Sequence, residues 1–242
     1  MGIPAGFIGR AQPLTIAGLR RASNIIGCDA ASVLAILDVE TVGCGFLPSR
    51  RPAILYERHI FHRRTKGEFD GYPDISNKTR GGYGQPGDNQ YTRLEKASKL
   101  NENAARCSAS WGIGQIMGFN HLMVGYDTVD DMISSFCDSE NAQVDSVARY
   151  CVSAKIDDDI RNKNWAGVAL GFNGEDYASH QYDKRLANRY AWHLAHTLDF
   201  GIRASQVRLM FAGIYTGRID GIDGPATQRA MAAAKQQGLD VA

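Results

Sequence analysis

The feature that most constrains the fold of this 242-residue chain is a helical spacing of apolar residues with one long interruption. Residues 13–26 and 30–42 carry apolar side chains three and four positions apart, and Asp29 before the second run is a suitable N-cap. The same spacing returns over 90–106, 112–124, 128–138, 140–161, 164–171 and 183–196. We therefore expect a mainly α-helical body.

The interruption between the second and third helical runs is rich in residues that favour turns. Glycine and proline gather in 43–52, so the second helix must end there, and 53–56 has the composition of a short extended segment. Residues 65–88 contain many Gly, Asp, Asn, Pro and Tyr residues. Long irregular stretches of this kind often carry function. We expect a small irregular or β region here.

Charge and hydropathy exclude several classes of protein. The chain has 27 Lys+Arg against 26 Asp+Glu, so it lacks the basic field that nucleic-acid binding requires. No apolar run reaches the roughly 18 residues that span a bilayer, and residues 11–19 lack the apolar core of a signal peptide. We expect a monomer with no nucleic-acid partner, no membrane insertion and no signal peptide.

Cysteine and histidine patterns give no support to a metal site. The five cysteines are widely spaced, without a CxxC pair, as buried thiols of a reducing compartment are. His59 and His62 lie three residues apart, as do His193 and His196, but neither pair has the HExxH arrangement of a zinc amidase or endopeptidase. We expect no metal and no other cofactor.

Glu40 is the first candidate for acid chemistry. It follows Val33, Ile36 and Leu37 at helical spacings, which places its carboxyl on the apolar face of the predicted helix, one turn before Gly43. A carboxyl on an apolar face should have a raised pKa, as a general acid requires. Spacing alone also allows an exposed helix end or a structural ion pair.

Glu57 is the candidate for the second carboxylate that glycoside hydrolysis usually needs. It directly follows the apolar segment 54–56, so that a strand or loop can carry it back beside the helix of Glu40. The alternative is a surface ion pair with Arg58 or Arg51. A carboxyl separation of about 5 to 5.5 Å favours retention and about 6.5 to 9.5 Å favours inversion, so the stereochemistry stays open.

The segments around both glutamates closely resemble the N-acetylmuramidase domain of bacteriophage endolysins. The resemblance covers nearly all of residues 10–196 and rests on Glu40, 45–47, 51–59, 81–84, 110–118, 119–120, 125–126, 172–174, Tyr177 and 182–183. It implies a lysozyme-like, mainly α fold that cleaves the β-1,4 bond from N-acetylmuramic acid to N-acetylglucosamine, with catalytic glutamates at Glu40 and Glu57. The family commonly has Ser where this chain has Thr41, which keeps the hydroxyl.

Five further residues are candidates for binding substrate. Gln115 and Asn173 can donate and accept hydrogen bonds, which suits sugar hydroxyls and N-acetyl groups, although an amide beside glycine can also bond its own turn. Tyr83, in the Gly-rich loop, and Tyr177 can stack on sugar rings. His59, two residues after Glu57, completes the predicted set.

The chain changes character near residue 197, where we place a domain boundary between a catalytic domain, 1–196, and a short helical module, 197–242. Residues 217–227 resemble the peptidoglycan-binding module of many wall hydrolases, through an Ile-Asp-Gly and a Gly-Pro-x-Thr motif. These residues also make tight turns and a helix start, so the motif can serve folding alone. About 45 residues bury little apolar surface, so we expect the module to pack on the catalytic domain.

Two other activities fit part of this pattern. A lytic transglycosylase uses one acid and leaves an anhydro sugar, whereas Glu57 favours hydrolysis. A wall-binding protein that has lost its chemistry would keep the same groove. The family resemblance further implies a protein that accumulates in the cytoplasm of an infected bacterium and then degrades the peptidoglycan of its wall.

Overall fold

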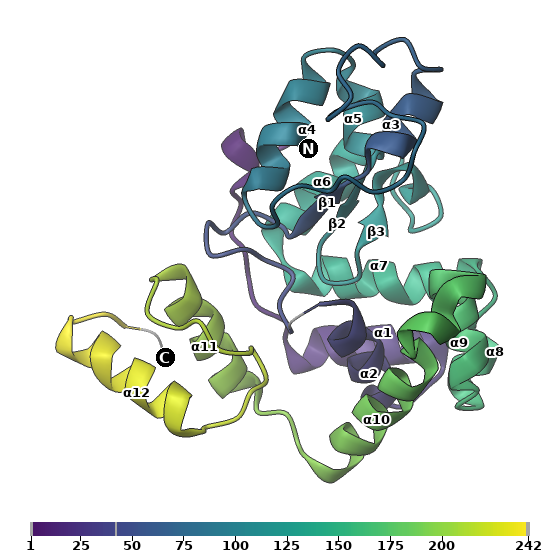
Figure 1. The fold of residues 1–242 in the computed structure, drawn as a ribbon. Coiled ribbons are helices and arrows are strands. Elements are labelled where there is room, and N and C mark those ends of the chain that lie inside the picture. Colours follow the sequence, from purple (N-terminus) through teal and green to yellow (C-terminus); the bar gives the residue numbers. More distant parts are fainter. Residues whose placement is uncertain (1, 42, 241–242) are drawn as a thin grey trace.

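The computed structural model describes residues 2–41 and 43–240, with the side chains of Asn173 and Asp176 outside the description. Figure 1 shows α7 across the middle of the catalytic body, with the small sheet and α3–α6 on one side and α1, α2 and α8–α10 on the other. Two further helices, α11 and α12, form the C-terminal segment. The architecture is mainly α-helical, as the sequence predicts.

The elements follow one another along the chain as short helices around a three-stranded sheet. Their bounds are η1 (Ala5–Phe7), α1 (Ile16–Ile26), α2 (Ala30–Glu40), β1 (Ile54–Tyr56), α3 (Arg58–Arg64), α4 (Asn89–Ser98), α5 (Glu102–Cys107), β2 (Ala109–Trp111), β3 (Ile116–Met117), η2 (Gly118–Asn120), α6 (Val129–Asp138), α7 (Glu140–Ser153), α8 (Asp157–Arg161), α9 (Trp165–Asn173), η3 (Glu175–His180), α10 (Tyr182–Ala195), α11 (Phe200–Phe211) and α12 (Pro225–Gln236).

The first two helices begin and end where local chemistry requires it. The Thr15 side chain accepts a hydrogen bond from the Gly18 N–H at the start of α1, and Asp29 accepts one from the Ser32 N–H at the start of α2. Gly27, in the left-handed conformation, ends α1. α1 packs against α7, and α2 packs against α10. The helix that carries Glu40 is therefore held on several sides.

The predicted helix over 112–124 is wrong, because this stretch continues a β-hairpin. The sheet order is β1-β2-β3, antiparallel throughout, with Ile54 paired to Trp111 and Ser110 paired to Met117. Gly112 has a φ of 69° and Gln115 a φ of 47°, and these left-handed conformations reverse the chain between β2 and β3. A left-handed pair of this kind cannot lie within an α-helix.

Three other helix predictions differ in detail. The predicted helix 90–106 is two helices, because Asn101 accepts a hydrogen bond from the Ala104 N–H and starts α5. The predicted helix 140–161 is also two, separated at Lys155, which has a φ of 60°. The short helix α3 was not predicted, since its run of Arg and His residues lacks an apolar periodicity.

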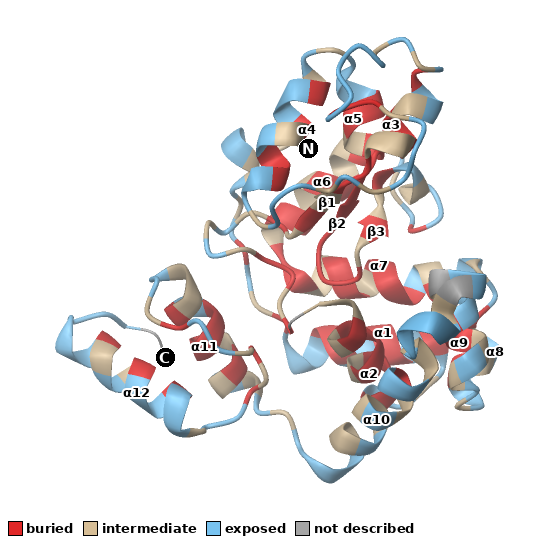
Figure 2. Ribbon diagram, in the orientation of Figure 1, coloured by how far each residue is buried: buried red, intermediate tan, exposed pale blue. Residues whose placement is uncertain are grey.

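One continuous apolar core fills the catalytic body (Figure 2). Its largest fully buried side chains include Trp111, Tyr56, Tyr91, Phe61 and Phe136. Among the described residues no single helix is long and apolar enough to cross a membrane, and only α1 and α2 together, bent by 102°, pass that test.

The C-terminal segment has a small core of its own and also packs on the catalytic body. Val207, Leu209, Tyr215 and Ile219 are buried with Ala230 and Ala234 of α12. The Phe211 ring meets the Phe46 ring at 6.2 Å between centroids.

Candidate active site

Glu40 is the last residue of α2 and lies half-buried against apolar surroundings. The next residue, Thr41, caps the helix through a hydrogen bond from its N–H to the Leu37 carbonyl at 3.1 Å. Burial raises the pKa of Glu40 to about 7, and the nearby charge of Arg185 lowers it only in part. The carboxyl therefore keeps its proton up to about pH 7.

Helices far away in sequence build the surroundings of Glu40. Arg185, on α10, donates a hydrogen bond to the Val39 carbonyl at 3.0 Å and lies over the Tyr182 ring. Tyr150, on α7, is close enough that the charge of Glu40 contributes to raising its pKa, after burial. The Tyr150 ring packs on Phe172 of α9 at 5.6 Å between centroids. Three helices thus meet at the end of α2.

A closed loop connects the end of α2 to Glu57. Phe46 forms a bridge with Pro52, and the Ala53 N–H donates a hydrogen bond to the Gly45 carbonyl at 2.8 Å. Glu40 lies five residues before Gly45, and Glu57 lies four residues after Ala53. The path between the two glutamates is therefore much shorter than their seventeen-residue separation in sequence suggests.

Glu57 lies at the N-terminal end of α3, directly after β1, and is only 8% exposed. Burial raises its pKa, while the charge of Arg80 and a hydrogen bond with the Tyr83 side chain oppose the rise. Its Oε2 lies 3.1 Å from His59 Nδ1, but the geometry is not that of a hydrogen bond. Burial and neighbouring arginines lower the pKa of His59, so this imidazole is neutral at pH 7.

The Gly-rich loop brings Tyr83 to Glu57. Gly82 has a φ of 65°, a left-handed conformation that favours glycine, and it lies against the Arg58 guanidinium group of α3. The Tyr83 carbonyl accepts hydrogen bonds at 2.7 Å from Gln90 Nε2 and from Arg93 Nη1, both on α4. These hydrogen bonds from α4 fix the backbone of Tyr83, and its side chain thereby lies beside the Glu57 carboxylate.

Gln115 lies in the turn between β2 and β3, and its amide mostly bonds that turn. Nε2 donates to the Gly112 carbonyl at 2.8 Å and to the Ala53 carbonyl at 3.4 Å, while Oε1 accepts from the Ser110 hydroxyl at 2.8 Å. One acceptor position on Oε1 remains for another donor. These bonds are the ones expected from the turn-bonding alternative, and the open acceptor position is the part of the amide that can contact substrate.

The other two predicted substrate residues lie on the α9–η3 side. Tyr177 is half-buried in η3 and packs on the main core. Asn173 ends α9, and its side chain is outside the described atoms. The structure therefore places Tyr83 and His59 with Glu57, Gln115 in the hairpin turn, and Tyr177 in a separate segment.

Sequence reasoning missed several residues of the site. Tyr150 and Arg185 approach Glu40 only through packing of α7 and α10, and no local motif marks them. Gln90 and Arg93, which hold Tyr83, are hard to recognise in the sequence. A polar amide at the start of an amphipathic helix is usually exposed, whereas Gln90 is 1% exposed.

The histidine pairs are used in other ways. His62 Nδ1 lies 2.8 Å from Asp70 Oδ1, and His193 Nε2 lies 2.9 Å from Asp38 Oδ2. Across the described residues, no group of three or more His, Cys, Asp or Glu side chains is arranged to hold a metal ion.

Comparisons with known proteins locate the same region. The family model of N-acetylmuramidase matches residues 29–194, most of the chain. The crystal structure of Burkholderia AP3 phage endolysin is similar, with a TM-score of 0.70 and 37% sequence identity over 77% of this chain and 72% of that chain. No curated protein matches. The matched residues include Glu40 and Glu57, and the match ends on α10.

Proposed function

The chain belongs to the N-acetylmuramidase family, and from this we propose that it cleaves the β-1,4 bond from N-acetylmuramic acid to N-acetylglucosamine. It is a glycoside hydrolase of the lysozyme type, and its substrate is bacterial peptidoglycan. The observation that carries the bond-breaking proposal is Glu40, a half-buried carboxyl with a pKa of about 7 at the end of α2.

Glu40 is the general acid in this proposal. A group that protonates a leaving glycosidic oxygen must hold its proton at the working pH and release it readily, which a pKa near 7 allows. The apolar setting of α2 supplies that pKa, and Arg185 keeps it from rising further. Val33 and Ile36, earlier on α2, are buried in the core, whereas Glu40 at the helix end stays partly exposed and can reach a substrate.

Glu57 is the second carboxylate of this proposal. It is buried at the start of α3, where burial raises its pKa while Arg80 and Tyr83 favour its ionised form. An ionised carboxylate at this position acts as a base on water if the two carboxyls are about 6.5 to 9.5 Å apart, and as a nucleophile if they are about 5 to 5.5 Å apart.

Tyr83 and His59 flank this second carboxylate and are proposed to contact sugar. Tyr83 presents a ring in the Gly-rich loop, and His59 presents a neutral imidazole. Tyr177 and Asn173, on η3 and α9, are proposed to contact sugar as well. Gln115 is proposed mainly to shape the hairpin turn, with one acceptor position of its amide oxygen open to substrate.

The cellular role proposed is that of an endolysin. The similarity to a phage endolysin supports a protein that is made in the host cytoplasm and reaches the wall at lysis. Residues 197–242 are proposed as a peptidoglycan-binding module, and the chain as a monomer that binds no nucleic acid and does not insert in membranes.

Product analysis tests the bond and both roles together. Purified peptidoglycan is digested with wild type, Glu40→Gln and Glu57→Gln, and the soluble products are identified by mass spectrometry. We expect new reducing N-acetylmuramic acid ends from wild type and a loss of two orders of magnitude or more in Glu40→Gln. Anhydro ends would identify a lytic transglycosylase, and equal lysis by wild type and Glu40→Gln would identify a wall-binding protein.

The role of Glu57 has a separate test. Proton NMR at the start of digestion distinguishes the anomer first released from the one formed by later mutarotation. The α-anomer appearing first shows inversion at the β bond and makes Glu57 the base on water. The β-anomer appearing first shows retention and makes Glu57 the nucleophile.

A further inference from the structure

The segment that follows Glu40 is held by a residue of the C-terminal segment. Arg203, on α11, donates a hydrogen bond from Nη2 to the Gly43 carbonyl at 2.6 Å. Gly43 has a φ of 93°, and an added Cβ would lie 2.3 Å from the Ile219 carbonyl oxygen. The chain three residues after Glu40 is thus in direct contact with two parts of the C-terminal segment.

The same guanidinium forms a buried ion pair with Glu140, the first residue of α7. Nη1 lies 2.6 Å from Oε2 and Nη2 lies 3.0 Å from Oε1, with side chains that are 3% and 0% exposed. This bidentate geometry fixes both side chains in orientation as well as in distance. Although burial opposes it, the pKa of Glu140 is lowered, chiefly by Arg203, so the carboxyl is ionised.

Glu140 in turn holds the catalytic body at two further points. Oε1 accepts a hydrogen bond from the Gly45 N–H at 2.8 Å, and Oε2 accepts one from the Leu14 N–H at 2.7 Å. Gly45 is also packed tightly, since an added Cβ would lie 1.8 Å from Gln143 Oε1. Gly43 and Gly45 both lie in the loop that follows Glu40. Arg203 bonds the first and Glu140 bonds the second, so one ion pair fixes both.

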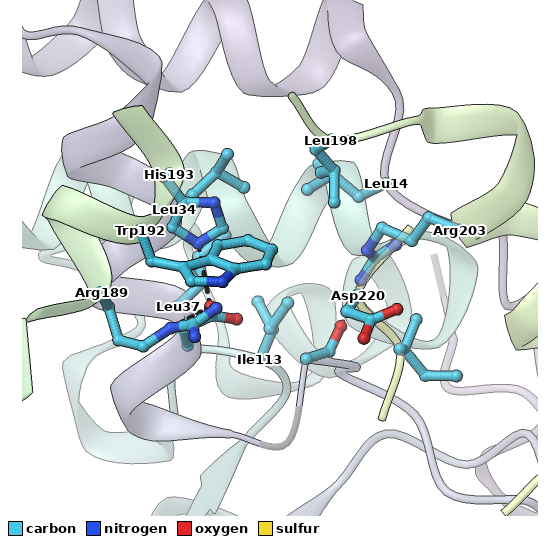
Figure 3. Close-up of a pocket in the computed structure, with 13 residues that line it drawn as sticks. Leu14, Leu34, Leu37, Ile113, Arg189, Trp192, His193, Leu198, Arg203 and Asp220 are labelled. Atoms are coloured by element: carbon cyan, nitrogen blue, oxygen red, sulfur yellow. Dashed lines mark hydrogen bonds and ion pairs between the residues drawn. The ribbon is translucent and has the colours of Figure 1, made fainter. Parts of the chain in front are cut away.

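The hydrogen bond from Arg203 to the Gly43 carbonyl is not the sole link between the C-terminal segment and the catalytic body. Asp38 and Arg218 already join the two parts of the chain, with Arg218 Nη2 3.1 Å from Asp38 Oδ1. Figure 3 shows Arg203 and Asp220 on one side of the pocket at this junction, facing Trp192, His193 and Arg189 on the other. Arg203 joins the two parts differently, because its guanidinium donates a hydrogen bond to the backbone that follows Glu40.

We propose that Arg203 is a positioning residue for catalysis, acting through the Gly43 carbonyl and Glu140 to hold the end of α2 and hence the Glu40 carboxyl. This inference rests on the proposed role of Glu40. It assigns to the C-terminal segment a part in the reaction itself, in addition to any binding of the wall.

The test compares full-length wild type with Arg203→Lys, Arg203→Met and the control Arg218→Gln. Lysine keeps the charge beside Glu140, but its single nitrogen cannot reproduce the bidentate contact with that carboxylate together with the bond to the Gly43 carbonyl. Arg218→Gln removes the other ion pair across the junction and leaves Asp38 bonded to Arg189 and His193. Reducing ends released from solubilised glycan strands give kcat and KM, at temperatures where circular dichroism shows each variant folded.

We expect kcat to fall by tenfold or more in both Arg203 variants with KM within about twofold, and the alkaline limb of the pH profile to move, because Glu40 is no longer held in place. Arg218→Gln should keep both constants within twofold. A folded Arg203→Lys with wild-type kcat and pH profile overturns the proposal, as does a failure of both Arg203 variants to fold, which would assign the ion pair to stability alone.

Glu40→Gln, assayed in parallel, separates this inference from the proposed function. If Glu40→Gln stays active, Glu40 is not the general acid, and Arg203 has no catalytic carboxyl to position. If Glu40→Gln is inactive while the Arg203 variants match wild type, only the positioning inference fails.

Discussion

Arg185 places its positive charge near Glu40 and donates a hydrogen bond to the neighbouring Val39 carbonyl, yet the pKa of Glu40 remains at about 7. Burial therefore raises the pKa of Glu40 by more than the charge of Arg185 lowers it. Both influences come from packing of α10 on α2, so that the same contact that shields the carboxyl also limits how far its pKa rises.

The first prediction concerns the alkaline limb of activity. A general acid must be protonated, so kcat/KM for peptidoglycan should fall as pH rises through about 7. Arg185→Gln removes the charge that lowers this pKa and should move the limb to higher pH. The measurement is the rate of reducing-end release across pH 5 to 9. An alkaline limb unmoved in Arg185→Gln would contradict the assignment.

The second prediction concerns stability. The folded pKa of Glu40 is raised from 4.5 to about 7, so ionisation destabilises the fold: this stability is fully present below pH 4.5 and is lost as pH rises through 7. The shift corresponds to roughly 3 kcal/mol. Glu40→Gln should match wild type in urea unfolding at pH 4.5 and exceed it at pH 8. A difference that stays constant with pH would mean that Glu40 is not the titrating group.

The third prediction concerns Tyr83→Phe. The hydroxyl of Tyr83 lowers the pKa of Glu57 by bonding its ionised form, so its removal should raise that pKa further. A base or a nucleophile must be deprotonated, and the acid limb of kcat/KM should therefore move to higher pH while the alkaline limb stays. If Tyr83 only stacks on sugar, KM will change at every pH and the acid limb will not move.

The fourth prediction concerns Gln115→Ala. The amide bonds the Gly112 and Ala53 carbonyls and the Ser110 hydroxyl, so its loss should destabilise the protein by about 1–3 kcal/mol. Thermal denaturation measures this, and Ser110→Ala, which removes one of these bonds from the other side, should have a smaller effect of the same sign. Well below its Tm, Gln115→Ala should keep kcat/KM within about threefold. A loss of tenfold or more with little change in Tm would instead make Gln115 a substrate residue.

The first two helices and the partial burial of Glu40 were predictable because both depend on local pattern. The spacing of Val33, Ile36 and Leu37 fixes which side of α2 is buried, and the structure places Glu40 half-buried at the end of that helix. The hairpin at 109–117 was not predictable in the same way. Its apolar residues fit a helix locally, and its strand character comes from pairing with Ile54, more than fifty residues earlier.

The residues that contact the two glutamates could not be predicted from the sequence, for a related reason. Tyr150 and Arg185 come to Glu40 from helices whose packing no short motif specifies. Tyr83 was singled out for its Gly-rich setting, but its contact with Glu57 depends on the buried Gln90 side chain, which reads as an ordinary surface amide.

The carboxylate of Glu140 has a consequence for how the chain folds. Its hydrogen-bond partners lie 126 and 95 residues before it and 63 residues after it, at Leu14, Gly45 and Arg203. Without Arg203 in place, the catalytic body would bury a carboxylate that has no cation beside it, which is costly. Docking of α11 and the final folding of the catalytic body should therefore occur as one cooperative step.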